Sequence, residues 1–183
     1  DYLHRSSMED MKQLLSDLPE NDNHHFELIS DYNLFSLAVH QVVEEKDIEL
    51  IIMGTKGATG AKEIFIGSNT GDVIMRNSCD VIAVPENHKY REPKEIVFPT
   101  DFQIDYDFED LAPLISLAEK NESMINIIHF SDHSNLSSLQ KEHKRKLDLF
   151  LSKIKHTYYT LSSSNFEEGI NCFTQSRGNI DMI

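Results

Sequence analysis

Two short, mostly apolar runs, residues 48–53 and 81–84, constrain most strongly what this chain can fold into. Both runs are bounded by turn residues, and a glycine-rich segment lies between them. Apolar strands of this length are typical of parallel sheets, because crossover helices cover both faces of such sheets. The sequence therefore predicts an α/β fold.

Along the rest of the chain, segments with helical spacing of apolar residues alternate with short apolar segments typical of strands. Apolar residues recur at three- and four-residue spacing, which predicts helices, at 8–18, 33–46, 108–118, 136–154 and from Ser68 onward. Short apolar segments predict further strands at 26–30, 95–98 and 124–128.

An internal match indicates two related repeats. Residues 26–51 align without a gap with residues 158–183, each meeting the residue 132 positions later, and DIELI meets NIDMI. Duplication is the favoured interpretation, and shared α/β patterning is the alternative. The predicted organisation is a first repeat at 1–86, a polar linker at 87–93 and a second repeat at 94–183. At this offset the first repeat lacks its start and the second its end.

Composition excludes several classes of protein. With 183 residues, 39% of them hydrophobic, the chain is expected to fold as a soluble globular protein. The formal net charge of −14 disfavours nucleic acids and anionic membranes as partners. No apolar stretch approaches a membrane span and no leader opens the chain, so we expect a cytoplasmic protein.

No catalytic or metal-ligating set is expected from the side chains. The two cysteines show no metal-ligand spacing, and the nine histidines form no matched set. The acidic cluster at 101–110 is interpreted as a loop and a helix N-terminus. The basic run KEHKRK at 141–146 is expected to face solvent.

The segment GTKGATGAKEIFIGSNT, which begins at Gly54, carries the chemistry. Glycines let a backbone approach a ligand closely, and the N–H groups of a helix that starts at Ser68 could bind phosphate. Lys56 or Lys62 could add a positive charge, and magnesium could bridge the phosphates. The alternative is an ordinary strand-to-helix turn in which Ser68 is a helix N-cap. Neither GxxxxGK[ST] nor GxGxxG is present.

The spacing Gly-x2-Gly-x9-Gly-Ser directly after an apolar strand resembles the ATP-binding pattern of the universal stress protein family. The surrounding MGTKGATGAKEIFIGSNTGDVIMRNSCDVIAVP is similar to that family's last strand, loop, helix and strand. PTDF at 99–102 resembles the end of its first strand. The resemblance implies a doubly wound, Rossmann-like parallel sheet with strand order 3-2-1-4-5, and a ligand at the switch between strands one and four.

Carried over by motif position, the resemblance implies the following nucleotide-binding residues: Met53, Gly54, Gly57, Gly67, Ser68, Asn69, Thr70 and Asp101. Met53 would lie against adenine, the first two glycines along ribose and phosphates, and the helix start over the phosphates. Asp101 would lie beside adenine in the second repeat. No complete site can be read, because each repeat is expected to hold one half of it.

The expected function is binding of ATP, or of AMP or ADP, by a stress-response regulator that is not an enzyme. A ligand-free interaction scaffold and a slow nucleotide hydrolase are the alternatives. The apolar edge strand at 81–84 is expected to pair with its equivalent, between repeats or in a homo-oligomer, because exposed strand edges are normally covered or paired.

Overall fold

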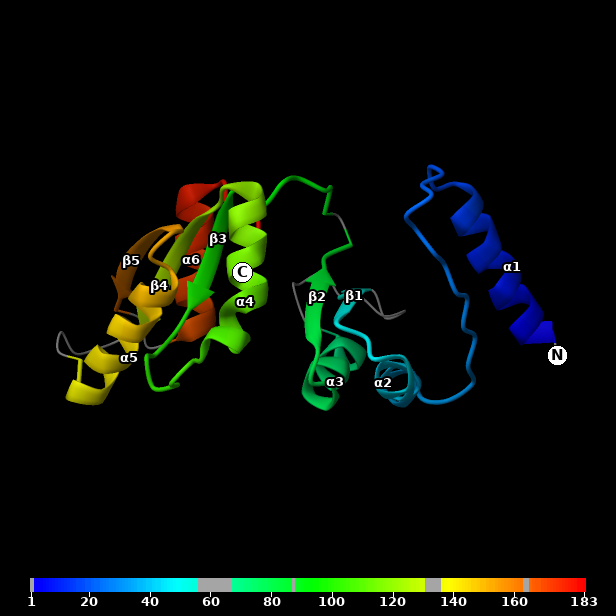
Figure 1. Cartoon of the computed structure of the whole chain (residues 1–183), viewed down its shortest axis with the longest axis horizontal. Helices are drawn as coiled ribbons and strands as arrows, with labels where there is room; N and C mark the ends of the chain where they lie inside the picture. Colours follow the sequence, from blue (N-terminus) through cyan, green and yellow to red (C-terminus); the bar gives the residue numbers. More distant parts are fainter. Residues whose placement is uncertain (1, 56–66, 87, 131–135, 163–164) are drawn as a thin grey trace. The chain divides into compact units, whose positions relative to one another are not determined.

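The chain divides into two compact units, Asp1–His88 and Lys89–Ile183. The structure, a computed structural model, describes residues 2–55, 67–86, 88–130, 136–162 and 165–183. The division falls within the segment expected to be a linker. Each unit alternates helices with parallel strands (Figure 1). The prediction of an α/β fold with parallel sheets is therefore confirmed.

The first unit contains a two-stranded parallel sheet. In chain order its elements are α1 (Tyr2–Ser16), α2 (Phe35–Lys46), β1 (Leu50–Gly54), α3 (Ser68–Arg76) and β2 (Asp80–Val84). β1 and β2 pair in parallel along their whole length. The two apolar runs of the sequence are thus neighbouring strands, and α3 lies in the connection between them.

The second unit is built around a three-stranded parallel sheet. Its elements are β3 (Glu95–Pro99), α4 (Phe108–Asn121), β4 (Met124–Phe130), α5 (Ser138–Phe150), β5 (Lys155–Leu161) and α6 (Phe166–Arg177). β4 lies between β3 and β5. On the other edge of β3, Met182 forms a parallel bridge with Ile96, and its carbonyl accepts the N–H of Val97 at 2.9 Å.

Helices cover both faces of the sheet in the second unit. On one face, Leu111 of α4 and Leu147 of α5 join a core cluster with Ile125 and Ile127 of β4. On the other face, residues of α6 pack against residues of β3 and β4 in a second cluster: Ile170, Phe173, Val97 and Ile128. This is the doubly wound arrangement in one unit. The full order 3-2-1-4-5 and the repeat relationship stay predictions.

Side-chain caps fix where the helices of the second unit begin. The Asp107 carboxylate accepts the N–H of Asp110 at 3.1 Å, and the Asp110 carboxylate accepts the N–H of Asp107 at 3.1 Å. Ser137 and Gln140 form the same reciprocal pair at the start of α5. Such capping boxes satisfy N–H groups that have no partner inside the helix. Part of the acidic cluster therefore serves as a helix cap, as expected.

The predicted strand at 26–30 is wrong. These residues make no strand pairing, and Phe26 is 58% exposed. A strand needs a neighbour that bonds its backbone N–H and C=O groups, and none of the described residues provides one here. The segment aligned with it in the second unit, by contrast, lies in β5 and pairs with β4.

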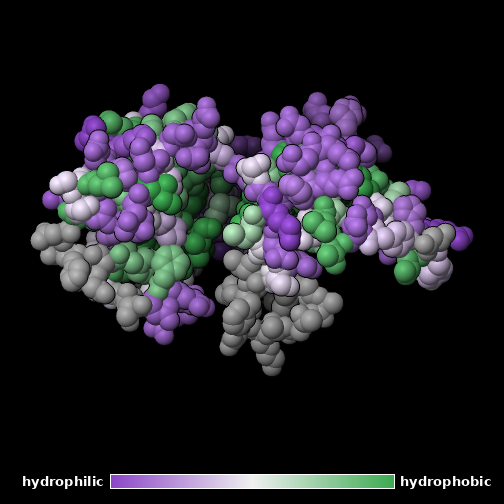
Figure 2. Space-filling view, turned by 90° about the horizontal axis from the view of Figure 1, so that it is seen from below, coloured by the Kyte–Doolittle hydropathy of each residue, from purple (hydrophilic) through white to green (hydrophobic). Residues whose placement is uncertain are grey.

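The two units differ in how much apolar surface they bury. Among the described residues, Val43 and Val73 are the buried hydrophobic side chains of the first unit, whereas both core clusters belong to the second. Hydrophobic residues reach the surface of the first unit among hydrophilic ones (Figure 2), and Ile52 is 67% exposed. The first unit therefore has less apolar burial to stabilise it.

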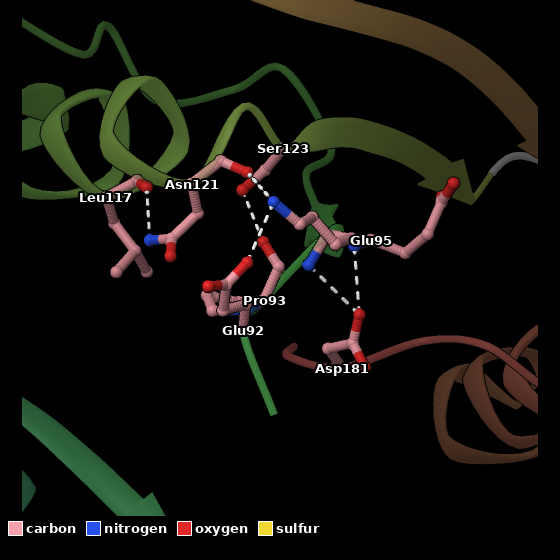
Figure 3. A network of polar contacts seen from close by, with 8 residues as sticks. Glu92, Pro93, Glu95, Leu117, Asn121, Ser123 and Asp181 are labelled. Atoms are coloured by element: carbon pink, nitrogen blue, oxygen red, sulfur yellow. Dashed lines mark hydrogen bonds and ion pairs between the residues drawn. The ribbon is translucent and has the colours of Figure 1, made fainter. Parts of the chain in front are cut away.

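A polar network joins the amino ends of β3 and β4 to the last residues of the chain (Figure 3). The Asp181 carboxylate accepts the backbone N–H groups of Lys94 and Glu95 at 3.0 and 3.1 Å. The ammonium of Lys94 donates to the Asn121 carbonyl at 2.8 Å, and the Ser123 hydroxyl donates to the Pro93 carbonyl. These bonds fix the start of the sheet.

Replacing Leu147 tests the core of the second unit. We expect Leu147→Ala to lower the free energy of unfolding by about 2 to 5 kcal/mol, because it removes a 1% exposed side chain from a packed cluster. Leu149→Ala is the matched control on the same helix and should change it by less than about 0.5 kcal/mol, since Leu149 is 58% exposed. Urea unfolding followed by circular dichroism measures both. Equal losses would contradict the placement of α5.

Candidate functional site

The two ends of the glycine-rich segment are tied together by hydrogen bonds. The hydroxyl of Thr70, in the first turn of α3, donates to the carbonyl of Gly54 at the end of β1, 3.1 Å away. The N–H of Gly67 donates to the Thr55 carbonyl at 3.0 Å, and the N–H of Thr55 donates to the Val84 carbonyl at 3.1 Å. The amino end of α3 is therefore fixed beside the carboxyl end of the parallel sheet.

The amino end of α3 carries no side-chain cap. Gly67 occupies the N-cap position and makes no side-chain hydrogen bond, and its carbonyl accepts the N–H of Gly71 at 3.0 Å. Ser68 and Asn69, the first two helical residues, are exposed. A helix leaves its first N–H groups without intrahelical partners, and its dipole adds a partial positive charge there. An anion could bind here without any basic side chain.

The end of β1 leaves space over its backbone. A Cβ atom added to Gly54 would meet nothing within 4 Å, so packing among the described residues does not require glycine there. Met53, the preceding residue, is half-buried. A glycine that packing does not require fits a position where another molecule approaches the main chain.

Thr70 is buried beside Gly54, whereas the motif implies a position over the phosphates. It is 2% exposed, and its hydroxyl proton is used on the Gly54 carbonyl. It therefore acts on the ends of the loop and leaves Ser68 as the exposed hydroxyl at the helix start. Sequence reasoning missed Thr55, whose backbone joins both β2 and Gly67, because backbone contacts of this kind have no residue signature.

Several residues of the sequence hypothesis lie outside the described part of the chain. They are Gly57, Lys56 and Lys62. The structure therefore brings together Met53, Gly54 and the start of α3. Their relation to the middle of the loop stays a prediction.

Asp101 lies in the second unit, in a tight turn that follows β3. Its carboxylate accepts the N–H of Gln103 at 2.8 Å, and its carbonyl accepts from the Gln140 side chain at 2.8 Å. The next residue, Phe102, has a left-handed backbone with φ of 57° and is 2% exposed. The turn after β3 is therefore held by α5, and one Asp101 oxygen takes part in the turn itself.

Asp105, a further acidic residue near this turn, has a structural partner. Asp105 lies 2.7 Å from the ammonium of Lys146, whose hydrogen bond holds the pKa of that carboxyl below its ordinary value. Within the described ranges, no three His, Cys, Asp or Glu side chains are grouped as metal ligands would be. The described site thus offers backbone N–H groups and hydroxyls, which suit binding of an anion.

Comparison with known families bears on this same segment. Residues 36–85 match the model of the universal stress protein family. The match covers α2, β1, α3 and β2, so the resemblance drawn from the glycine spacing is confirmed for this part of the first unit. It does not reach the second unit. No curated protein matches the chain. Among the described residues, no helix is both long and apolar enough to span a bilayer.

The tie between Thr70 and Gly54 can be tested by an isosteric replacement. Thr70→Val should lower the free energy of unfolding of the first unit by about 1 to 3 kcal/mol, because the Gly54 carbonyl loses its donor in a partly buried place. It should also speed amide hydrogen exchange at Gly67. Hydrogen exchange followed by NMR measures both effects. Thr70→Ser keeps the hydroxyl and should protect the Gly67 amide as the wild type does. Unchanged protection in Thr70→Val would show that the hydrogen bond from Thr70 to Gly54 does not hold the loop ends together.

Proposed function

We propose that this protein is a nucleotide-binding regulator of stress responses, and that ATP, ADP or AMP binds between the end of β1 and the start of α3. The observation that carries the proposal is the uncapped amino end of α3, held to β1 by Thr70 inside the segment that matches the family model. This arrangement supplies phosphate-binding N–H groups at a sheet edge where α/β folds commonly take ligands.

Because the protein is strongly acidic, binding a nucleotide requires hydrogen-bond donors close to the phosphates. The chain has 31 acidic and 17 basic residues, so a nucleotide is repelled by most of its surface. Backbone N–H groups and the helix dipole act over one helical turn and need no net positive charge on the protein. In the proposal the phosphates lie over Gly67, Ser68 and Asn69.

In the proposal, the base and the ribose lie at the end of β1. Met53 lies directly before Gly54, so an adenine packed on Met53 would leave the ribose over the open Gly54 backbone. Gly57 would line the phosphates, with magnesium bridging them where it is bound. Asp101 is proposed to lie beside a base in the second repeat. Its carboxylate is exposed and accepts the N–H of Gln103 in the turn after β3.

Two other functions compete with this one. An interaction scaffold without ligand would use the glycine loop only as a turn, and a slow hydrolase would turn the nucleotide over. Nucleotide that copurifies with the protein would distinguish the ligand-free scaffold from the other two functions.

The edge of β2 that faces away from β1 is the surface where we propose pairing with an equivalent strand.

Gly67→Val tests nucleotide binding directly. The added side chain would project at the start of α3 and obstruct the phosphate position. Loss of two hydrogen bonds to a charged group weakens affinity by roughly a hundredfold or more. Titration calorimetry with ATP on the full chain measures this.

The matched control is Gly71→Ala on the same helix. A Cβ atom at Gly71 meets nothing within 4 Å, so this variant should bind ATP as the wild type does. If Gly67→Val binds ATP as tightly as the wild type does, the assignment of the loop to nucleotide is wrong.

Bound ATP should not be turned over at an ordinary enzymatic rate. Phosphoryl transfer to water needs a group that orients the attacking oxygen, and the described site offers only N–H groups and hydroxyls. We expect far less than about one turnover per second, the lower end of typical enzymes. A phosphate-release assay with magnesium measures this. Glu63 is the only acidic residue of the glycine-rich segment. Sustained hydrolysis of ATP that Glu63→Gln abolishes would make the protein an enzyme.

A further inference from the structure

A cavity lies in the second unit, at the carboxyl ends of β4 and β5 beside α5. Its volume is about 160 Å³, and it is lined in part by Phe102, His129, Lys144, Tyr158 and Thr160. This is room for roughly five waters at about 30 Å³ each, and it is below the roughly 300 Å³ at which drug-sized sites begin. A nucleotide does not fit, but a small ion does.

The buried side chain of His129 lines this cavity. The side chain is 6% exposed, and its ring lies 4.9 Å from that of Phe102. Nδ1 lies 3.1 Å from the Thr100 carbonyl, which can only accept, so Nδ1 carries the proton. In the neutral ring Nε2 is then an acceptor, and no described residue donates to it. A ligand that enters the cavity and carries a proton can donate it to Nε2.

Lys144 brings a positive charge to the same cavity. Its ammonium lies 4.2 Å from the centre of the Tyr158 ring and makes no ion pair within the described ranges. The closest comparison is Lys146 on the same helix, which is paired with Asp105. The ammonium of Lys144 is therefore paired with no described carboxylate, and the face of the Tyr158 ring holds it in place.

The other polar groups of the cavity are compatible with an anion. Burial, followed by the charge of Asp148, raises the pKa of Tyr158 above its ordinary value, so the phenol stays neutral. Oδ1 of Asp148 lies 3.0 Å from Nε2 of His156. Thr160 is exposed at the end of β5 and adds a hydroxyl donor. The basic run at 141–146 gives this end of an acidic protein a local positive field.

We propose that this cavity is a binding site for a small oxyanion that carries a proton, namely hydrogen phosphate. Lys144 and Thr160 donate to its oxygens, and Nε2 of His129 accepts its P–OH proton. The site uses none of the residues of the glycine loop and stands or falls independently of nucleotide binding. The proton distinguishes hydrogen phosphate from sulfate, which is similar in size and charge but has no proton to give at neutral pH.

The test is an NMR titration of the full chain, with ¹⁵N-labelled histidine, against inorganic phosphate at constant ionic strength. Phosphate should shift the ring nitrogen resonances of His129 and leave those of the exposed His24 unchanged. Lys144→Met keeps the apolar stem over Tyr158 and should weaken phosphate binding by about tenfold or more, as expected for a charged hydrogen bond. Sulfate should bind more weakly than phosphate by a similar factor.

Matched variants make the result decisive. Lys141→Met removes the same charge from an exposed position of α5 and should leave phosphate affinity within about twofold. Thr160→Val, on the surface, should weaken it severalfold without unfolding the protein. Gly67→Val should leave the His129 shift intact. Absence of a His129 shift, equal affinity for sulfate, or equal losses in Lys141→Met and Lys144→Met would each overturn the proposal.

Discussion

Parallel strands depend on cover over both faces and on a hydrogen-bonded neighbour at each edge, and this dependence explains most differences between the two units. In the second unit, α4 and α5 cover one face and α6 the other, while Met182 pairs with the free edge of β3. β3 and β4 are accordingly largely buried, whereas β5 has only exposed and partly buried residues. In the first unit β1 has one neighbour, and Ile52 on its exposed face remains 67% open.

The same dependence decides how far the sequence alone could predict the fold. Period and turn residues located α1 to α5 and β1 to β4, because apolar spacing and capping residues such as Asp107 and Ser137 act locally, but they located neither β5 nor α6. They failed at 26–30, since a strand forms only together with a paired strand and no described strand pairs with these residues. The aligned residues in β5 show that the same kind of sequence becomes a strand when β4 is available.

The candidate site was predictable in kind more than in detail. Glycine spacing after β1 led to the helix start at Ser68, which a match to the universal stress protein family over residues 36–85 supports. It did not reveal that Thr70 turns inward to Gly54. Nor could it find the cavity at His129, because that cavity joins the ends of β3, β4 and β5 with α5, and no short motif spans elements so far apart in sequence.

The bond between Thr70 and Gly54 has a consequence for the entropy of binding. Bringing the two ends of a loop together costs conformational freedom whether folding or a ligand does it. Here two hydrogen bonds, from Thr70 and from Gly67, close the loop as part of the fold. A ligand that binds at the start of α3 therefore meets a preorganised closure, and its affinity is not reduced by that share of the ordering cost. The length of the loop between these two ties can then vary without moving the amino end of α3.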